Sequence, residues 1–246
     1  MGVLKNELIR LLFPDICLVC EEIYTEGGDV CICRKCMERV RYCRDYARCR
    51  ICSAPVSDGH TLCSRCAADK RCFTGNYSCV VYRGQLHGAI LKFKFYNRPY
   101  YFRSFAEMLL NELAAHDASD NFDLVAYVPI HRKKLKKRGY DQSRLLAEYI
   151  AKRLRLPLAA GSIVKIKDTP PQSRIKLYAE RVKNVKDAFS VPDGSVFAGR
   201  RVLLIDDIYT TGATLNEVSG IILKCGAKSC HAATIAISDR RKNNTN

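Results

Sequence analysis

Long hydrophobic runs are missing from this 246-residue chain. No stretch approaches the roughly eighteen consecutive apolar residues that a membrane-spanning helix needs. The amino end has no apolar core of the kind found in signal peptides, and low-complexity sequence is confined to the polar tail Arg240–Asn246. The sequence therefore argues against a transmembrane or secreted protein and predicts a cytoplasmic one.

Acidic residues are scarce relative to basic ones. The chain has 25 Asp and Glu against 41 Lys and Arg, which gives a formal net charge of +16. A surface this basic attracts polyanions such as nucleic acid or acidic lipid, and it also suits an enzyme whose substrate carries several phosphates. Charge alone does not choose between these partners.

Cysteine, in contrast, is abundant, and eight of the 14 cysteines form Cys-x-x-Cys pairs. Each pair presents two thiolates to one ion, and two pairs complete the tetrahedral four-sulfur shell of structural zinc. Neither loop can bury enough apolar surface to fold without its ion. Pairing in sequence order closes the shorter loops. It predicts two closed structural zinc sites, with Cys17, Cys20, Cys33 and Cys36 in the first and Cys49, Cys52, Cys63 and Cys66 in the second.

Alternatives to this zinc arrangement stay open. The pairs could be cross-braced or redox-active, although no strand-helix context of the thioredoxin kind surrounds them. Cys31 also offers the first site an alternative ligand through the spacing Cys31-x-Cys33. With zinc bound to eight thiolates, the net charge would fall to about +12, which is still strongly basic.

Length and an apolar content of 48% allow one α/β domain of ordinary size plus a small appendage. We expect an N-terminal helix and a double zinc ribbon in residues 1–72, and the larger domain in residues 73–246. Leucines at helical spacing predict that the N-terminal helix docks on the core. They are Leu4, Leu8, Leu11 and Leu12. Strand-like and helix-like segments alternate through the larger domain, which predicts a doubly wound sheet. The expected strands are 77–82, 124–128, 202–205 and 232–237, and the expected helices include 86–95, 105–113 and one that begins near 213.

The most informative stretch of the larger domain is Val202–Thr214, with the sequence VLLIDDIYTTGAT. Its first four residues are apolar, which is typical of a buried strand in a parallel sheet. Asp206 and Asp207 follow where this strand should end, at the edge where open α/β sheets bind their ligands. A threonine-rich turn then precedes the predicted helix.

This turn suits a phosphate group. Gly212 lets the backbone approach an anion, the threonine hydroxyls can donate hydrogen bonds, and the start of a helix adds roughly half a positive charge. Carboxylates beside an anion make sense if they hold sugar hydroxyls or a metal ion, so the expected ligand is a ribose with a 5′-phosphate. The alternative is an ordinary turn after a buried strand. The cradle residues are Thr210, Thr211, Gly212, Ala213 and Thr214.

This run resembles the PRPP-binding motif of type I phosphoribosyltransferases. Together with the cysteine pairs and the segments PIHRKKLKKRGYDQSRLLA and TPPQSRIKLYAERVKNVKDAF, it makes nearly the whole chain similar to the ComF (ComFC-like) competence protein family. The resemblance implies a type I phosphoribosyltransferase fold, a mostly parallel doubly wound sheet, with a small N-terminal zinc-ribbon domain of four-cysteine sites. It also implies PRPP as substrate with Mg²⁺, and Asp206 and Asp207 as catalytic residues.

Two further segments acquire roles through this resemblance. The loop after strand 124–128 corresponds to the pyrophosphate loop, formed here by Pro129, Ile130, His131 and Arg132. Residues 168–188 correspond to the flexible loop that closes over the substrate, where the matching positions are Gln172, Arg181 and Asn184. Pro170-Pro171 should prevent regular structure in this loop, and an exposed linker is the alternative reading.

The resemblance supports two hypotheses about function. The first is transfer of a phosphoribosyl group to a nitrogen acceptor. The identity of this acceptor stays open because purine-salvage relatives carry a carboxylate at the position of Thr210. The second is a cytoplasmic single-stranded DNA-binding component of the DNA-uptake machinery, with PRPP as a regulatory ligand. Its candidate DNA-binding residues are Lys133, Lys134, Lys136, Lys137 and Arg138, although a solvated basic loop would look the same. A strip of aromatic and basic residues could add stacking, unless its tyrosines belong to the core: Tyr96, Arg98, Tyr100, Tyr101 and Arg103.

Overall fold

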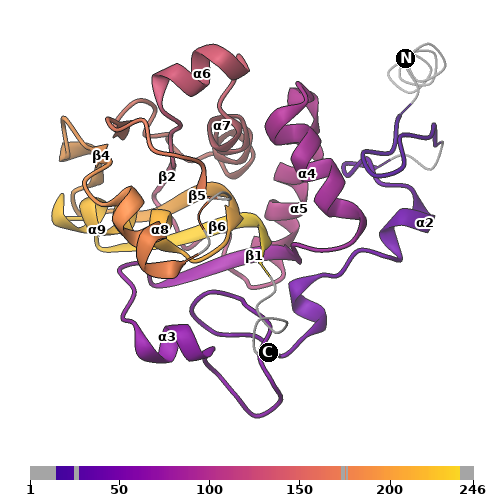
Figure 1. Ribbon diagram of the computed structural model, residues 1–246, viewed down its shortest axis with the longest axis horizontal. Coiled ribbons are helices and arrows are strands. Elements are labelled where there is room, and N and C mark those ends of the chain that lie inside the picture. Colours follow the sequence, from indigo (N-terminus) through magenta and orange to yellow (C-terminus); the bar gives the residue numbers. More distant parts are fainter. Residues whose placement is uncertain (1–14, 25–27, 173–174, 176, 239–246) are drawn as a thin grey trace.

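The computed structural model describes residues 15–24, 28–172, 175 and 177–238. The predicted N-terminal helix and the polar tail lie outside these residues. The centre of the molecule is a parallel sheet in the order β1 (Gly75–Val81), β6 (Ser229–Ile237), β5 (Arg201–Tyr209) and β2 (Leu124–Tyr127). Figure 1 shows this sheet crossing the middle of the molecule. The predicted α/β fold is thereby confirmed.

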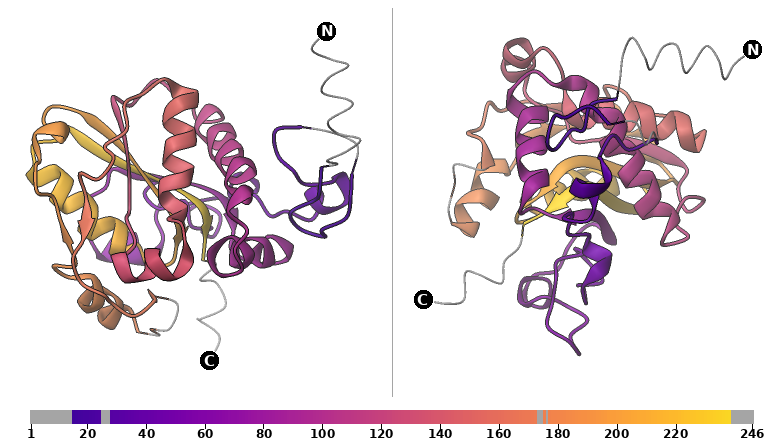
Figure 2. Two further views of the ribbon diagram at one scale, coloured as in Figure 1. Left: turned by 90° about the horizontal axis from the view of Figure 1, so that it is seen from above. Right: turned by 90° about the vertical axis from the view of Figure 1, so that its right-hand side faces the viewer.

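Helices cover both faces of the sheet (Figures 1 and 2). On one face, α4 (Gln85–Phe95), α5 (Phe102–Ala114) and α7 (Gln142–Leu154) form a core with Leu203 and Ile205. On the other face, α9 (Ala213–Lys224) packs with Val202 and Leu204. Because neighbouring strand residues point to opposite faces, the continuous apolar run of β5 supplies both cores at once.

The predicted strand 202–205 is longer in the structure. β5 continues to Tyr209 because β6 still pairs with it there, with Asp206 opposite Thr234 and Tyr209 opposite Ile237. Asp206 and Asp207 therefore lie inside the strand, as its sixth and seventh residues, and not after it. Their backbone is fixed by the sheet, which makes their position more rigid than a loop would.

The basic run after β2 is a helix and not the loop that the sequence suggested. α6 (Arg132–Arg138) begins after His131, whose Nδ1 accepts a hydrogen bond from Lys133 N, and it ends at Gly139 with φ 84°. A capping side chain and a left-handed glycine are strong helix boundaries. They outweigh the repulsion among the like charges.

The described part of residues 168–188 includes a helix that the sequence did not predict. After the prolines, α8 (Tyr178–Val185) forms a helix that packs on α9, and a two-stranded antiparallel ribbon joins β3 (Val164–Lys165) to β4 (Phe189–Ser190). The prolines exclude regular structure only from their immediate surroundings, because Tyr178–Val185 contains no helix breaker.

The cysteine-rich segment forms two separate loops (Figures 1 and 2). The first loop carries α2 (Arg34–Met37), and its Leu18 and Ile32 join the core of α4 and α5. The second carries α3 (Ser64–Ala68) and contributes Ala54 to the opposite core. Short 3-10 turns lie at Cys43–Asp45, Pro99–Tyr101 and Ser195–Phe197. In the described part of the chain, no helix is long and apolar enough to cross a membrane.

Candidate functional site

The ends of β2 and β5 bring together the predicted pyrophosphate loop, residues 129–132, and the two aspartates, Asp206 and Asp207. Tyr127 pairs with Ile205, and Val128 N then donates to Ile205 O over 3.0 Å. The loop 129–132 consequently leaves the sheet directly beside Asp206 and Asp207. This is the carboxyl edge of the sheet, where open α/β proteins bind ligands.

Asp206 is held by two hydrogen bonds and lies in a half-buried position. Its Oδ1 accepts from Ser143 Oγ at 3.0 Å and from Asp207 N at 2.9 Å. Burial, with the nearby charge of Asp207, raises the pKa of Asp206 to about 7, against the opposing effect of Lys94. A carboxylate with this pKa is readily neutralised, so a cation or hydroxyl donor at this position would lower its free energy.

Asp207 points to the other face of the sheet and forms an ion pair. Its Oδ2 lies 2.8 Å from Lys94 Nζ at the end of α4, and the two side chains are 13% and 21% exposed. A pair this well shielded is stronger than an ordinary surface ion pair. Nothing in the sequence around Lys94 indicated this contact, because it depends on how α4 packs on the sheet.

The threonine-rich turn leads into α9 as predicted. Gly212 has φ 78°, and a Cβ there would overlap the phenol of Tyr209, so only glycine fits. Thr211 Oγ1 accepts from Ala213 N at 3.4 Å. The N-cap residue Gly212 has no side chain to accept from the next N–H groups of α9. With the Ala213 N–H already donated to Thr211, the Thr214 and Leu215 N–H groups are the first-turn donors that would face an anion.

Asp141 connects the loop 129–132 to α7. Its carboxylate accepts from Ile130 N at 2.9 Å and from Arg144 N at 3.2 Å, so one side chain caps α7 and fixes the loop. Burial raises its pKa. The sequence signal for the cap was an Asp at the start of a predicted helix, but the link to Ile130 was not foreseeable.

The candidate DNA-binding cations lie on α6. Lys133, Lys136 and Lys137 are exposed, and so is Arg132 at its first position. Lys134 Nζ donates to Thr169 O at 2.5 Å, and Arg138 lies over the ring of Phe95 at 5.3 Å. A cleft of about 760 Å³ runs between α6 and the end of α4, and its lining residues are Lys94, Phe95, Asn97, Lys134, Lys136, Lys137, Arg138, Gly139 and Pro171.

The three flexible-loop positions hold the backbone of their own segment. Gln172 Nε2 donates to Arg181 O at 3.2 Å, and Asn184 Nδ2 donates to Pro170 O at 3.2 Å. Arg181 Nε donates to Ile175 O at 2.7 Å. These contacts tie α8 to the turn around Pro170, so α8 and the turn are coupled to each other.

Lys165 is a further residue at this site that the sequence did not single out. It lies on β3, and the charges that act on it are Lys134, Asp206 and Asp168. Burial lowers its pKa, and Lys134 adds to this effect. The antiparallel pairing of β3 with β4 positions it, and so short a ribbon has no clear sequence signal.

The eight predicted zinc ligands gather in two clusters, in the sequential pairing that loop length favoured. Within each cluster the four sulfur atoms lie within 4.8 Å of one another. Cys20 and Cys33 Sγ are 3.8 Å apart, and Cys52 and Cys63 Sγ are 3.7 Å apart. Tetrahedral zinc with Zn–S distances of about 2.3 Å separates its sulfurs by about 3.8 Å, so the donor set fits zinc.

Cys31 is not part of the first cluster. Its backbone N donates to Ser104 Oγ at 2.9 Å, which fixes this part of the loop against α5. The tyrosine strip also divides: Tyr96 and Tyr100 are 68% and 55% exposed, whereas Tyr101 is buried and donates to Glu21 Oε1 at 3.3 Å. Tyr101 therefore belongs to the core.

Comparison with known proteins identifies both parts of the chain. The double zinc ribbon domain family matches residues 8–67, and the phosphoribosyl transferase domain family matches residues 141–245. Competence protein F of Haemophilus influenzae is 29% identical over 208 residues, which cover 80% of this chain and 86% of that protein. DNA utilization protein YhgH of Escherichia coli is 25% identical, covering 88% and 94%. Competence protein ComFC of Bacillus subtilis is 23% identical, covering 91% and 95%.

Two of the similar solved structures each match a little over half of this chain. Glutamine PRPP amidotransferase of Bacillus subtilis is 21% identical with a TM-score of 0.39, and the match covers 59% of this chain but only 30% of that one. Adenine phosphoribosyltransferase of Saccharomyces cerevisiae is 14% identical with a TM-score of 0.37, covering 58% and 71%.

Proposed function

Because this chain belongs to the ComF family, which joins a double zinc ribbon to a type I phosphoribosyltransferase domain, we propose that it binds PRPP with Mg²⁺ and transfers the phosphoribosyl group to a nitrogen acceptor. The observation that carries the proposal is the register of β2 and β5. Tyr127 pairs with Ile205. Asp206 and Asp207 directly follow Ile205, and the loop 129–132 begins two residues after Tyr127, so the loop lies beside the two aspartates.

Each group of the site has a partner on the substrate. The turn Thr210–Thr214 and the start of α9 hold the 5′-phosphate, since Gly212 allows close approach and the helix carries partial positive charge. Asp206 and Asp207 accept hydrogen bonds from the ribose hydroxyls. The loop 129–132 holds the pyrophosphate, and Lys94 and Lys165 add positive charge at the same edge.

The reaction exchanges one bond at the anomeric carbon for another. The acceptor nitrogen forms a bond to this carbon, the bond to the pyrophosphate oxygen breaks with its electron pair, and the acceptor loses a proton. Mg²⁺, when bound with PRPP, offsets the negative charge of the phosphates, and the oxygen donors of Asp206 and Asp207 suit such a hard cation. The half-buried carboxylates stabilise positive charge that develops on the ribose.

Release of pyrophosphate from PRPP in the presence of Mg²⁺ tests the proposal. With candidate nitrogen acceptors, the wild-type protein should release pyrophosphate, and Asp206→Asn or Asp207→Asn should abolish the release. Asp123→Asn is the matched control, because Asp123 pairs with Arg201 at the opposite end of β5. No release by the wild-type protein with any acceptor, or unchanged release in both site variants, would contradict catalysis.

A second candidate function is binding of single-stranded DNA during competence, in line with the names of two relatives, a competence protein and a DNA utilization protein. The cleft beside α6 favours it, because five cations line it and the exposed rings of Phe95, Tyr96 and Tyr100 lie on or next to α4. A cationic groove with aromatic platforms suits a flexible polyanion whose bases can stack.

The salt dependence of DNA binding tests this candidate. Neutralising Lys133, Lys136 and Lys137 to Gln should reduce the slope of log affinity against log salt by up to about 0.7 for each lost phosphate contact. Lys134 is spared because it supports Thr169. The matched control removes the same charge from α2 and its flank, at Arg34, Lys35 and Arg39, all exposed. Equal slopes in the two triple variants would eliminate the α6 surface.

A further inference from the structure

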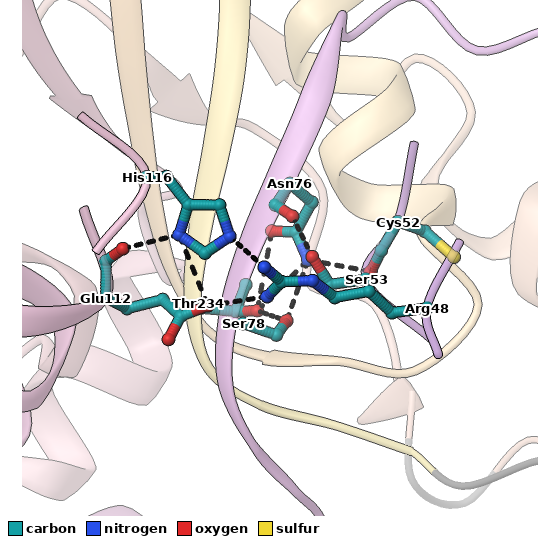
Figure 3. Close-up of polar contacts among 8 residues, drawn as sticks. All are labelled: Arg48, Cys52, Ser53, Asn76, Ser78, Glu112, His116 and Thr234. Carbon is teal, nitrogen blue, oxygen red and sulfur yellow. Dashed lines mark hydrogen bonds and ion pairs between the residues drawn. The ribbon is translucent and has the colours of Figure 1, made fainter. Parts of the chain in front are cut away.

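The second zinc loop, residues 48–71, is anchored to the sheet by polar contacts (Figure 3). Arg48 Nη1 donates to Glu112 Oε1 of α5 at 2.9 Å, and the Glu112 side chain is only 2% exposed. Ser53 Oγ donates to the carbonyl of Asn76 in β1, while Asn76 Nδ2 donates to Cys52 O at 3.1 Å. A predicted zinc ligand and the edge strand β1 are therefore joined through one buried amide.

On its other side, this loop holds the first residue of α8. Arg65 Cζ lies 4.4 Å from the ring centroid of Tyr178, and Arg71 Cζ lies 5.9 Å from it. Arg71 Nη1 also donates to Tyr178 Oη at 3.0 Å. Two cation–π contacts and a hydrogen bond thus meet on one aromatic side chain.

Arg71 links Tyr178 to the zinc site. Its side chain is 2% exposed, and Nε and Nη2 are buried without a hydrogen-bond partner in the described part of the chain, apart from a long ion pair of 3.9 Å from Nη2 to Asp69. Cys66, a predicted ligand of the second zinc site, interacts electrostatically with Arg71. When zinc is bound, a thiolate at Cys66 would supply negative charge near this guanidinium.

The rest of α8 is held by α9, beside which Val185 is buried. A hollow of about 330 Å³ separates α8 from the second zinc loop and the first turn of α9, and Val182 and Asn216 are among its lining residues. Leu177 and Val182 are 63% and 40% exposed. The position of α8 against the second zinc loop consequently depends on Tyr178.

We infer that Tyr178 is a positioning residue, through which the zinc-loaded second loop fixes α8 and the adjoining turn 168–172. The turn is tied to α8 because Asn184 and Gln172 join the two, and Thr169 of the turn accepts from Lys134 of α6, the helix that follows the pyrophosphate loop. The part of this inference that concerns PRPP rests on the proposed function. Loss of zinc from the second site releases the segment from its working position.

Hydrogen exchange of the full-length, zinc-loaded protein without PRPP tests the inference. Tyr178→Ala should speed exchange of the α8 amides by about tenfold, as expected for loss of two cation–π contacts and a hydrogen bond. Exchange in α7 should stay unchanged. In Tyr178→Phe, the exchange rate of the α8 amides should lie between those of the wild type and Tyr178→Ala. The control Leu177→Ala removes an exposed neighbour and should exchange as the wild type does. Equal exchange of α8 in Tyr178→Ala and Leu177→Ala would overturn the inference.

Removal of zinc supplies the second arm of the experiment. In the chelated wild type, α8 should exchange as fast as in zinc-loaded Tyr178→Ala, and chelation should have no further effect on α8 in that variant. Equal loss of protection in α7 and α8 would indicate general unfolding and contradict the coupling, as would full protection of α8 after chelation.

PRPP binding separates this inference from the proposed function. If the wild type binds PRPP, Tyr178→Ala should weaken binding severalfold while Leu177→Ala leaves it unchanged, and equal affinity would contradict the positioning role. If the wild type binds no PRPP, the proposed function fails, and the exchange rates alone then decide whether Tyr178 holds α8.

Discussion

The surroundings of Asp206 disfavour its negative charge, although its side chain accepts two hydrogen bonds. Burial and Asp207 raise its pKa to about 7, whereas the unfolded chain should titrate near the ordinary value of about 3.9. The folded state therefore binds the proton more tightly than the unfolded state. This contribution to stability is fully present below about pH 4 and is lost as the pH rises through 7.

Asp206→Asn should therefore stabilise the free protein at alkaline pH. An amide Oδ1 can still accept from Ser143 and Asp207 N, while the disfavoured charge is gone. We expect the free energy of unfolding to rise by about 1–2 kcal/mol at pH 8 and to change little at pH 4. Urea denaturation at the two pH values measures this difference. A variant that is less stable than the wild type at pH 8 would contradict the raised pKa.

Gly212 is the second residue with a specific requirement. Its φ of 78° and the closeness of Tyr209 leave no space for a side chain. Gly212→Ala should lower the free energy of unfolding by about 1–3 kcal/mol and weaken PRPP binding.

Gly88→Ala is the matched control for this substitution. Gly88 lies inside α4, and a Cβ there meets nothing within 4 Å, so alanine should stabilise α4 by about 0.5–1 kcal/mol. Thermal denaturation and PRPP titration of the two variants measure both effects. An equally tolerated alanine at Gly212 would argue against a tight phosphate turn.

At the scale of elements, the buried amide of Asn76 connects β1 with the second zinc loop. Asn76 is 4% exposed, and its Nδ2 also donates to Ser78 Oγ at 2.8 Å. Asn76→Ala would leave the Cys52 carbonyl and Ser78 without this donor. We expect a loss of about 1–3 kcal/mol in the free energy of unfolding and faster release of zinc to a chelator from one of the two sites.

Asn121→Ala serves as the control for this variant. Asn121 donates only to Asp117 O at an exposed position, so its loss should change stability by less than about 0.5 kcal/mol. Calorimetry and a colorimetric zinc-release assay measure the two variants. Release of zinc from the two sites of the wild type should be biphasic. If neither phase changes in Asn76→Ala, β1 and the second zinc loop are independent.

The sequence predicted some elements well for physical reasons. Strands β5 and β6 contain the apolar runs Val202–Ile205 and Ile235–Ile237, and the threonine turn with Gly212 indicates the start of α9. α6 was missed because a run of like charges has no amphipathic pattern, so only His131 and Gly139 define its ends. α8 was missed because the nearby prolines suggested that the whole segment lacks regular structure.

For the molecule as a whole, the predicted site was incomplete in a systematic way. Residues that follow one another in the chain, such as Asp206 to Thr214, could be recognised from their order. Lys94, Asp141, Ser143 and Lys165 come from α4, the start of α7 and β3, and they reach the site only through tertiary packing. Contacts of this kind depend on helix and strand placement, which composition and periodicity do not determine.

Positive charge and zinc act on the scale of the whole molecule as well. The cations of α6 and the end of α4 line one cleft next to the candidate phosphoribosyl site. The second zinc loop braces the sheet on one side and α8 on the other. A ligand with several phosphates and the loaded zinc site should therefore both favour the observed position of α8 and the turn 168–172.

A crystal structure of the zinc-loaded protein grown with PRPP and Mg²⁺ tests the central claim most directly. Our account predicts the 5′-phosphate within hydrogen-bonding distance of the backbone N–H groups of Thr210–Thr214, and the ribose hydroxyls at Asp206 and Asp207. The pyrophosphate should lie against the loop 129–132. PRPP bound elsewhere, or a turn closed to the phosphate at saturating PRPP, would contradict it.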